Sequence, residues 1–223
     1  RDKLVTGVQT CALPIFTIVR LHNRGIGHSA AIPSPAWTTR DAAADVVAVL
    51  DAAGLPGVAV YGHSLGGRIA QWVAADFPDR VTRLVLGATT TGDAHGLPRP
   101  EAATLAFESG DPLAALELVF SPGYLAAHPE AEKRTENRAV SPEQGALQLA
   151  MSTAHDGWDA LPRIRARTLV VHGVGDGVTD VRNASILHEH ITDADLLLLA
   201  GARHAYFYER ADANAMIAAF LAG

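Results

Sequence analysis

Short runs of consecutive apolar residues alternate with longer segments whose apolar residues recur at helical spacing. The short runs predict five strands, at Phe16–Leu21, Val58–Tyr61, Val81–Leu86, Arg167–His172 and Asp195–Leu199. Because these runs are short and continuously apolar, we expect both faces of the sheet to be covered. Strands that alternate with helices favour a mostly parallel sheet in an α/β fold.

Three segments have the periodicity of amphipathic helices. They are Arg40–Ala53, Gly66–Phe77 and Asp212–Leu221. Thr38 or Thr39 can cap the first of these helices, and Gly54 stops it. Pro78 ends the second helix, because proline cannot continue a helical ladder.

One long segment, from about Gly87 to Arg165, interrupts the alternation of strands and helices. It is punctuated by proline and is mostly helical in pattern. We therefore expect an insertion that forms a small helical cap over about residues 100–162. The cap would belong to a single domain that spans residues 16–223.

The first fifteen residues lack this patterning. They read RDKLVTGVQTCALPI, a string that resembles the translation of a common sequencing adapter. We interpret residues 1–15 as an artefact and leave them out of the fold reasoning. On this interpretation the natural N-terminus is missing, along with any signal peptide, and Cys11 is not a natural residue.

Composition narrows the classes of function. The chain has 24 acidic against 18 basic residues and a net charge of −6, which argues against nucleic acid as a partner. No apolar run approaches the roughly 18 residues of a membrane span. Its single cysteine excludes a disulfide framework within the chain and favours a cytoplasmic location.

The pentapeptide Gly62–Gly66 has the form G-x-S-x-G and lies directly between a predicted strand and a predicted helix. This placement predicts a nucleophile elbow, a tight turn that strains the backbone of Ser64 and exposes its hydroxyl. We expect side chains at Gly62 or Gly66 to clash in the turn, and Gly67 to let the helix approach its strand. The alternative is an ordinary turn serine.

A serine hydroxyl needs a general base and a group that orients the base. Asp176 and His204 each follow a predicted strand, and the chain order is Ser, Asp, His. His204 would accept the Ser64 proton while Asp176 fixes its tautomer. The backbone N–H of Leu65, at a helix N-terminus, would be one oxyanion donor. Asp180 is the alternative acid.

Other histidines compete with His204 for the role of base. His63 adjoins the serine and is expected to point away from it, although it is also a candidate for the pocket wall. His22, His28 and His172 lie near strand ends, where they could line a pocket.

At this point four segments together resemble the α/β-hydrolase superfamily. They are HNRGIGHS, the stretch from Val58 to Leu86, TLVVHGVGDGV and GARHAYFYE, in that order along the chain. The resemblance implies a serine esterase, an enol-lactonase or a related enzyme. His22 and His28 depart from the family pattern, which usually has Asp at the first position and commonly has Arg at the second.

The resemblance also implies that parts of the fold are missing. The first three strands of the family are absent, and its third strand would lie between Phe16–Leu21 and Val58–Tyr61. The loop that supplies the second oxyanion N–H is absent with them. Unpaired strand edges and a lost oxyanion donor predict that this chain is a poor or inactive hydrolase.

We expect Ser64 to attack a carboxylic ester, thioester or lactone of a small-molecule substrate through an acyl-enzyme. No metal and no cofactor is expected. Besides His63, aromatic and methionine residues of the insertion are candidates for an apolar pocket, with ordinary cap-to-core packing as the alternative: Phe107, Phe120, Tyr124, Met151 and Trp158. Cofactor-free haloperoxidase or perhydrolase chemistry, and a non-catalytic binding module, are the alternative functions.

Overall fold

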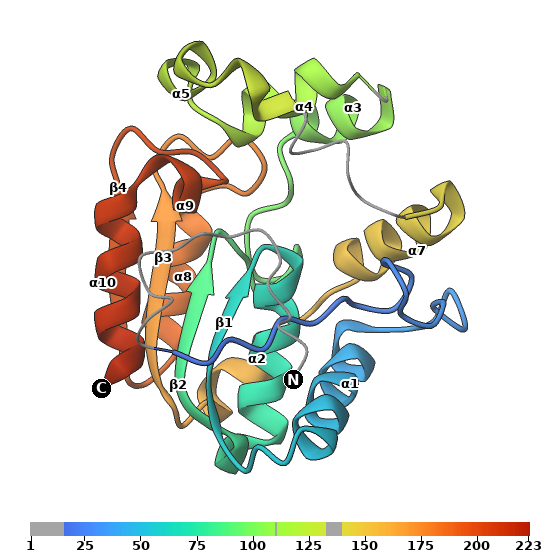
Figure 1. Ribbon diagram of the computed structural model, residues 1–223, viewed down its shortest axis with the longest axis vertical. Coiled ribbons are helices and arrows are strands. Elements are labelled where there is room, and N and C mark those ends of the chain that lie inside the picture. The colour runs from blue at the N-terminus through green and yellow to red at the C-terminus, as the bar shows by residue number, and fades with distance from the viewer. Residues whose placement is uncertain (1–15, 110, 133–139) are drawn as a thin grey trace.

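Four parallel strands form the centre of the molecule. The computed structural model describes residues 16–109, 111–132 and 140–223, so the adapter-like residues 1–15 lie outside the described part. The strands β1, β2, β3 and β4 lie side by side in chain order (Figure 1). Their bounds are Val58–His63, Val81–Gly87, Arg167–Gly173 and Ala194–Leu199. The predicted parallel sheet is confirmed.

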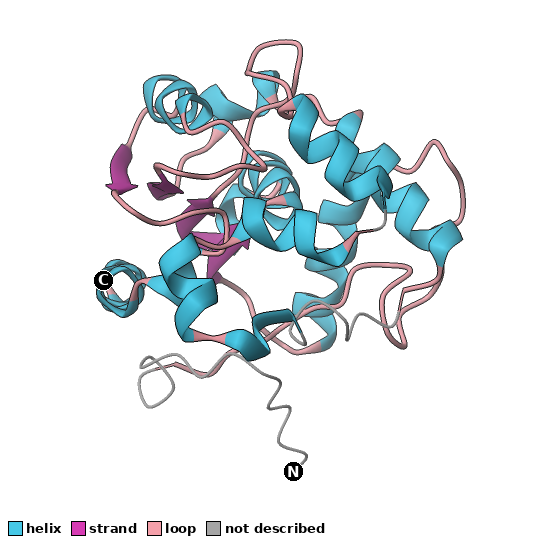
Figure 2. Ribbon diagram, turned by 90° about the horizontal axis from the view of Figure 1, so that it is seen from above, coloured by secondary structure: helices cyan, strands magenta, loops and turns pink. Residues whose placement is uncertain are grey.

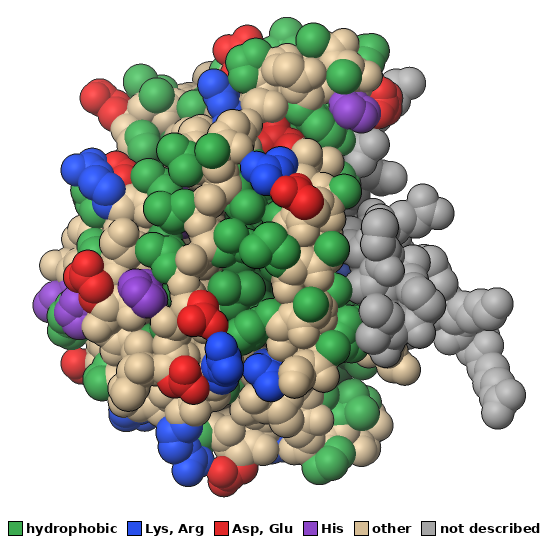
Figure 3. All heavy atoms as spheres, turned by 90° about the vertical axis from the view of Figure 1, so that its left-hand side faces the viewer, with side chains coloured by type: hydrophobic (Ala, Val, Ile, Leu, Met, Phe, Trp, Pro, Cys, Tyr) green, Lys and Arg blue, Asp and Glu red, His purple; other side chains and the backbone are tan. Residues whose placement is uncertain are grey.

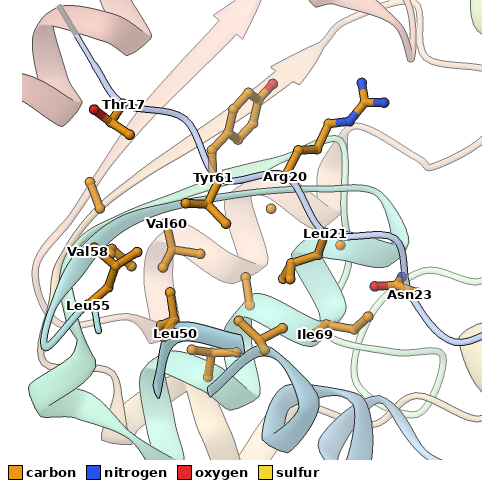
Figure 4. Close-up of a pocket in the computed structure, with 17 residues that line it drawn as sticks. Thr17, Arg20, Leu21, Asn23, Leu50, Leu55, Val58, Val60, Tyr61 and Ile69 are labelled. Atoms are coloured by element: carbon orange, nitrogen blue, oxygen red, sulfur yellow. The ribbon is translucent and has the colours of Figure 1, made fainter. Parts of the chain in front are cut away.

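The prediction of a strand at Phe16–Leu21 is wrong. This segment has no regular secondary structure, because no described strand lies beside it to accept its backbone hydrogen bonds. β1 is therefore an edge strand among the described residues. A cavity of about 390 Å³ separates β1 from residues 17–23 (Figure 4), and its walls include Leu21, Val60 and Ile69.

Helices cover both faces of the sheet (Figure 2). On one face lie α1, α2 and α8, and on the other lie α9 and α10. Their bounds are Thr39–Ala52, Leu65–Asp76, Arg182–His190, Tyr206–Glu209 and Ala211–Ala222. Alternate residues of β2 point to opposite faces of the sheet. Leu84 and Leu86 belong to the main core, which lies between the sheet and α1, α2 and α8. Val85 belongs to a second core under α9 and α10.

Local signals explain where the first helix begins and ends. Thr38 caps α1 through a capping box, in which its side chain accepts from the Asp41 amide and the Asp41 carboxylate accepts from the Thr38 amide. Gly54 follows the helix with a φ of +67°, a conformation that glycine adopts without strain. The predicted cap and stop of this helix are confirmed.

The long segment between β2 and β3 is helical, as its pattern predicts. It contains α3, α4, α5, α7 and the short 3-10 turns η2 and η3. Their bounds are Glu101–Ser109, Pro112–Val119, Pro122–Ala127, Pro142–Thr153, Pro129–Glu132 and Trp158–Arg163. The first three helices lie beyond the carboxyl ends of the strands (Figure 1). In contrast, η3 packs on α2, and its Leu161 is buried in the main core.

The opposite edge of the sheet is the surface shown in Figure 3. There β4 and α10 present apolar side chains among charged ones, with Leu198 and Met216 about half exposed. Within the described residues, no helix is both long enough and apolar enough to cross a membrane.

Candidate active site

Ser64 occupies the sharp turn between β1 and α2. Its φ of 54° and ψ of −119° lie outside the regions that a non-glycine residue adopts without strain, so the predicted strained turn is confirmed. The Ser64 amide donates to the carbonyl of Gly87 at 2.8 Å, and the Thr89 hydroxyl donates to the Ser64 carbonyl at 2.8 Å. These two bonds hold the turn against the carboxyl end of β2.

The glycines around Ser64 have different roles. A Cβ on Gly62 would lie 2.4 Å from the Gly66 carbonyl oxygen, and one on Gly67 would lie 2.6 Å from the Cβ of Thr89. The expectation that Gly66 is also required for space is wrong. A Cβ there would meet no described atom within 4 Å, because Gly66 borders the cavity beside β1.

The Asp176 carboxylate lies at the centre of a hydrogen-bond network. Its Oδ2 accepts from His204 Nδ1 at 2.8 Å and lies 3.0 Å from His172 Nε2. Its Oδ1 accepts from the amides of Val178 and Thr179, at 2.8 and 2.9 Å. Burial alone would raise the pKa of Asp176, but the charge and hydrogen bonds of the two imidazoles outweigh burial and hold this pKa well below its usual range.

His172 is the partner that sequence reasoning missed. It was a candidate to line a pocket, yet it is fully buried, and its Nε2 also lies 3.1 Å from the Thr179 carbonyl. Its Nδ1 has no hydrogen-bond partner among the described residues, whereas its Nε2 faces the oxygens of both Asp176 and Thr179. The available signal was the spacing of four residues between His172 and Asp176 across a strand end. The alternative acid, Asp180, instead pairs with Arg182 at 2.6 Å.

His63 supports the loop that carries His204. Its Nε2 donates to the His204 carbonyl at 2.9 Å, and the two rings meet edge to face with centroids 4.8 Å apart. The His63 ring also packs edge to face against the ring of Phe207, with centroids 4.9 Å apart. Burial, with a further contribution from His204, lowers the pKa of His63 to about 3. His63 directly precedes Ser64. As a neutral ring it therefore links the Ser64 turn to the loop that carries His204.

The aromatic and methionine residues predicted to line a pocket lie in three different places. Phe120 and Tyr124 stack with centroids 4.9 Å apart and cluster with Ala205, the residue after His204. Phe107 lies on α3 and is 40% exposed. Met151 is buried in the main core, where ordinary packing accounts for it.

Trp158, the remaining candidate, lies on η3 against the main core. Its ring stacks on His95 with centroids 4.5 Å apart. As for metals, the described part of the chain holds no group of three or more histidine, cysteine or acidic side chains that could bind an ion.

Another buried histidine contacts the start of α1. His155 is 3% exposed, and its Nδ1 shares a hydrogen bond of 2.8 Å with the hydroxyl of Thr39. Burial, aided by the positive charge of Arg68, lowers the pKa of His155 to about 3. The ring is therefore neutral in the folded chain at neutral pH.

Comparison with known proteins identifies the family. The sequence model of a family that is described as having the alpha/beta hydrolase fold matches residues 5–211. The chain belongs to the α/β-hydrolase fold family. A relative from Acinetobacter baylyi, 3-oxoadipate enol-lactonase 2, is 30% identical over 189 residues, which are 82% of this chain and 70% of the relative.

Solved structures agree with this assignment. A hydrolase from Pseudomonas aeruginosa is 28% identical with a TM-score of 0.73, over 90% of this chain and 78% of its own. An N-acyl homoserine lactone degrading enzyme is 29% identical with a TM-score of 0.72, over 89% of this chain and 80% of its own. The chain is an α/β-fold hydrolase, related to enzymes that are named for esters and lactones.

The neighbouring glycines Gly66 and Gly67 offer a matched test of the turn. Gly67→Ala is expected to lower the free energy of unfolding by about 1–3 kcal/mol, because its Cβ would overlap Thr89. The Cβ of Gly66→Ala would enter open space, so this substitution is expected to leave the free energy of unfolding unchanged or to raise it by up to about 1 kcal/mol. Urea unfolding of both variants measures the difference, and equal effects would contradict this account of the turn.

The pKa of His155 makes stability depend on pH. The pKa of His155 is lower in the folded chain than in the unfolded chain. The stabilisation that comes from keeping its ring neutral is therefore complete above about pH 6.5 and is lost as the pH falls toward 3. His155→Gln should reduce the slope of unfolding free energy against pH in this window by up to about 1.4 kcal/mol per pH unit. Urea unfolding from pH 7 to pH 4 tests this, and an unchanged slope would refute it.

Proposed function

We propose that the chain is a serine hydrolase that cleaves a carboxylic ester, thioester or lactone through an acyl-enzyme. Ser64 is the nucleophile, His204 the general base and Asp176 the residue that orients the base. The observation that carries this assignment is the hydrogen bond of 2.8 Å between Asp176 Oδ2 and His204 Nδ1. A carboxylate on Nδ1 leaves Nε2 as the atom that accepts a proton.

Three features support Ser64 as the residue that His204 activates. The strained backbone of Ser64 belongs to the type of turn that exposes a nucleophile at the start of a helix. His63, its neighbour, is bonded to the backbone of His204, which ties the two loops together. Within the described residues, the amide of Leu65 makes no hydrogen bond, so it is free to stabilise an oxyanion.

The reaction then follows in two halves. Ser64 Oγ attacks the substrate carbonyl while His204 Nε2 takes the hydroxyl proton, and the negative oxygen of the intermediate accepts from Leu65 N–H. The C–O or C–S bond breaks as His204 returns that proton to the leaving group. Water, deprotonated by His204, attacks the acyl-enzyme, releases the acid and restores Ser64.

Asp176 and Asp180 provide a matched pair that tests the assignment of the acid. Asp176→Asn should lower kcat for p-nitrophenyl butyrate by about 10⁴-fold, because an amide cannot hold the correct tautomer of His204. Asp180→Asn removes only the ion pair with the exposed Arg182 and should change kcat by less than about threefold. A larger loss for Asp180→Asn would transfer the role to Asp180.

Wild-type chain and Ser64→Ala serve as the reference and the background in the same assay. Hydrolysis that persists unchanged in Ser64→Ala would contradict the acyl-enzyme mechanism. A folded wild-type chain without hydrolysis of any ester or lactone would agree either with the expected loss of the second oxyanion donor or with a non-catalytic binding module.

A further inference from the structure

Arg68 is a buried cation without a carboxylate partner among the described residues. It lies on the first turn of α2, four residues and about 6 Å of helix after Ser64, and it is 8% exposed. One guanidinium nitrogen, Nη1, donates to the Ser152 hydroxyl of α7, and Nε has no hydrogen-bond partner in the described part of the chain. A buried guanidinium in such surroundings is costly unless an anion pairs with it.

Further unpartnered polar atoms belong to His155, which feels the charge of Arg68, and to residues of the same part of the fold. Six buried side-chain atoms of the described residues have no hydrogen-bond partner, and four of them belong to Arg68, Gln71, Thr91 and His155. A Cβ on Gly157 would lie 2.5 Å from Gln71 Oε1 and 2.9 Å from His155 Nε2, so these two atoms face the same point. Buried polar groups normally have partners, so this cluster suits a polar ligand.

The surroundings of Arg68 carry a surplus of positive charge. Burial, and then the charge of Arg99, lower the pKa of Arg68 to about 10, while Asp93 opposes this shift. Burial also lowers the pKa of Arg99. His155 is neutral, as its lowered pKa shows, and therefore adds no charge. Two cations against one exposed carboxylate favour an anion here.

This positive region adjoins the nucleophile. Asp93 and Arg99 lie on the segment that leaves the carboxyl end of β2, where the Gly87 carbonyl accepts from the Ser64 amide. The Arg99 guanidinium lies over the ring of Phe107, 5.6 Å from its centroid, on α3 beyond the strand ends (Figure 1). Arg68 therefore lies about one helical turn from Ser64, and Arg99 lies on the segment that begins beside the Ser64 turn.

We propose that Arg68 binds a carboxylate on the acyl part of the substrate, so that the preferred substrates are anionic esters or lactones. This inference rests on the proposed function of Ser64. In this proposal the Ser152 hydroxyl holds the Arg68 side chain in place, and the other guanidinium N–H groups donate to the substrate carboxylate. Arginine is suited to this role, because its planar donors match a carboxylate.

A pair of esters that differ only at the far end of the acyl chain tests the proposal. Mono-p-nitrophenyl glutarate carries a carboxylate where p-nitrophenyl valerate carries a methyl group. We expect kcat/KM of the wild-type chain to be about tenfold or more higher for the glutarate ester, the ratio that one charge-assisted hydrogen bond supplies. In Arg68→Met this ratio should fall toward one, and in Arg68→Lys it should be partly retained.

The control is Arg83→Met, which removes the same charge from a site where the guanidinium lies over Phe220 of α10. It should keep the wild-type ratio. A ratio near one in the wild-type chain, or a ratio that survives Arg68→Met, would overturn the proposal while leaving Ser64 as the nucleophile.

A binding measurement keeps the proposal testable even if neither ester is hydrolysed. Glutarate at ten times its Kd should raise the Tm of the wild-type chain and of Ser64→Ala by about 3 °C. Neutral glutaramide should not raise it, and Arg68→Met should respond to neither compound. Equal responses to both compounds, or no response to glutarate in any chain, would refute a carboxylate site at Arg68. Loss of hydrolysis together with a retained glutarate response would count against the proposed function alone.

Discussion

The buried carboxylate of Asp176 is the group on which the candidate site depends. Taking a carboxylate out of water is costly, so it requires compensation from nearly every direction. Here two imidazoles face Oδ2 and two backbone amides donate to Oδ1. These contacts join the end of β3, the turn after it and the histidine loop. The negative charge thereby fixes the position of His204, and His63 fixes the backbone of the same loop.

Much of the fold could be predicted from the sequence, because burial leaves a direct pattern. The strands β1 to β4 and the helices α1, α2 and α10 appear within a few residues of their predicted bounds. Phe16–Leu21 shows the limit of such reasoning. Its β-branched residues have strand propensity, but a strand also needs a neighbour, and the described residues place a cavity there instead.

The site could be predicted where a motif has a steric cause. The G-x-S-x-G pattern predicts the strained turn at Ser64, and the positive φ confirms it. Contacts between side chains that are far apart in the sequence leave no such motif. The contact of His172 with Asp176, the open space at Gly66 and the Arg68 guanidinium, which has no carboxylate partner among the described residues, all depend on packing between elements. Spacing along one chain does not specify such packing.

The most direct test of an activated Ser64 is the intact mass of the chain after exposure to a fluorophosphonate, alongside Ser64→Ala. Because the reagent reacts once per active site, even a slow hydrolase gives a complete adduct on long exposure. The account predicts a single adduct on the wild-type chain and none on Ser64→Ala. A folded wild-type chain that remains unlabelled, or an adduct that persists in Ser64→Ala, would contradict it.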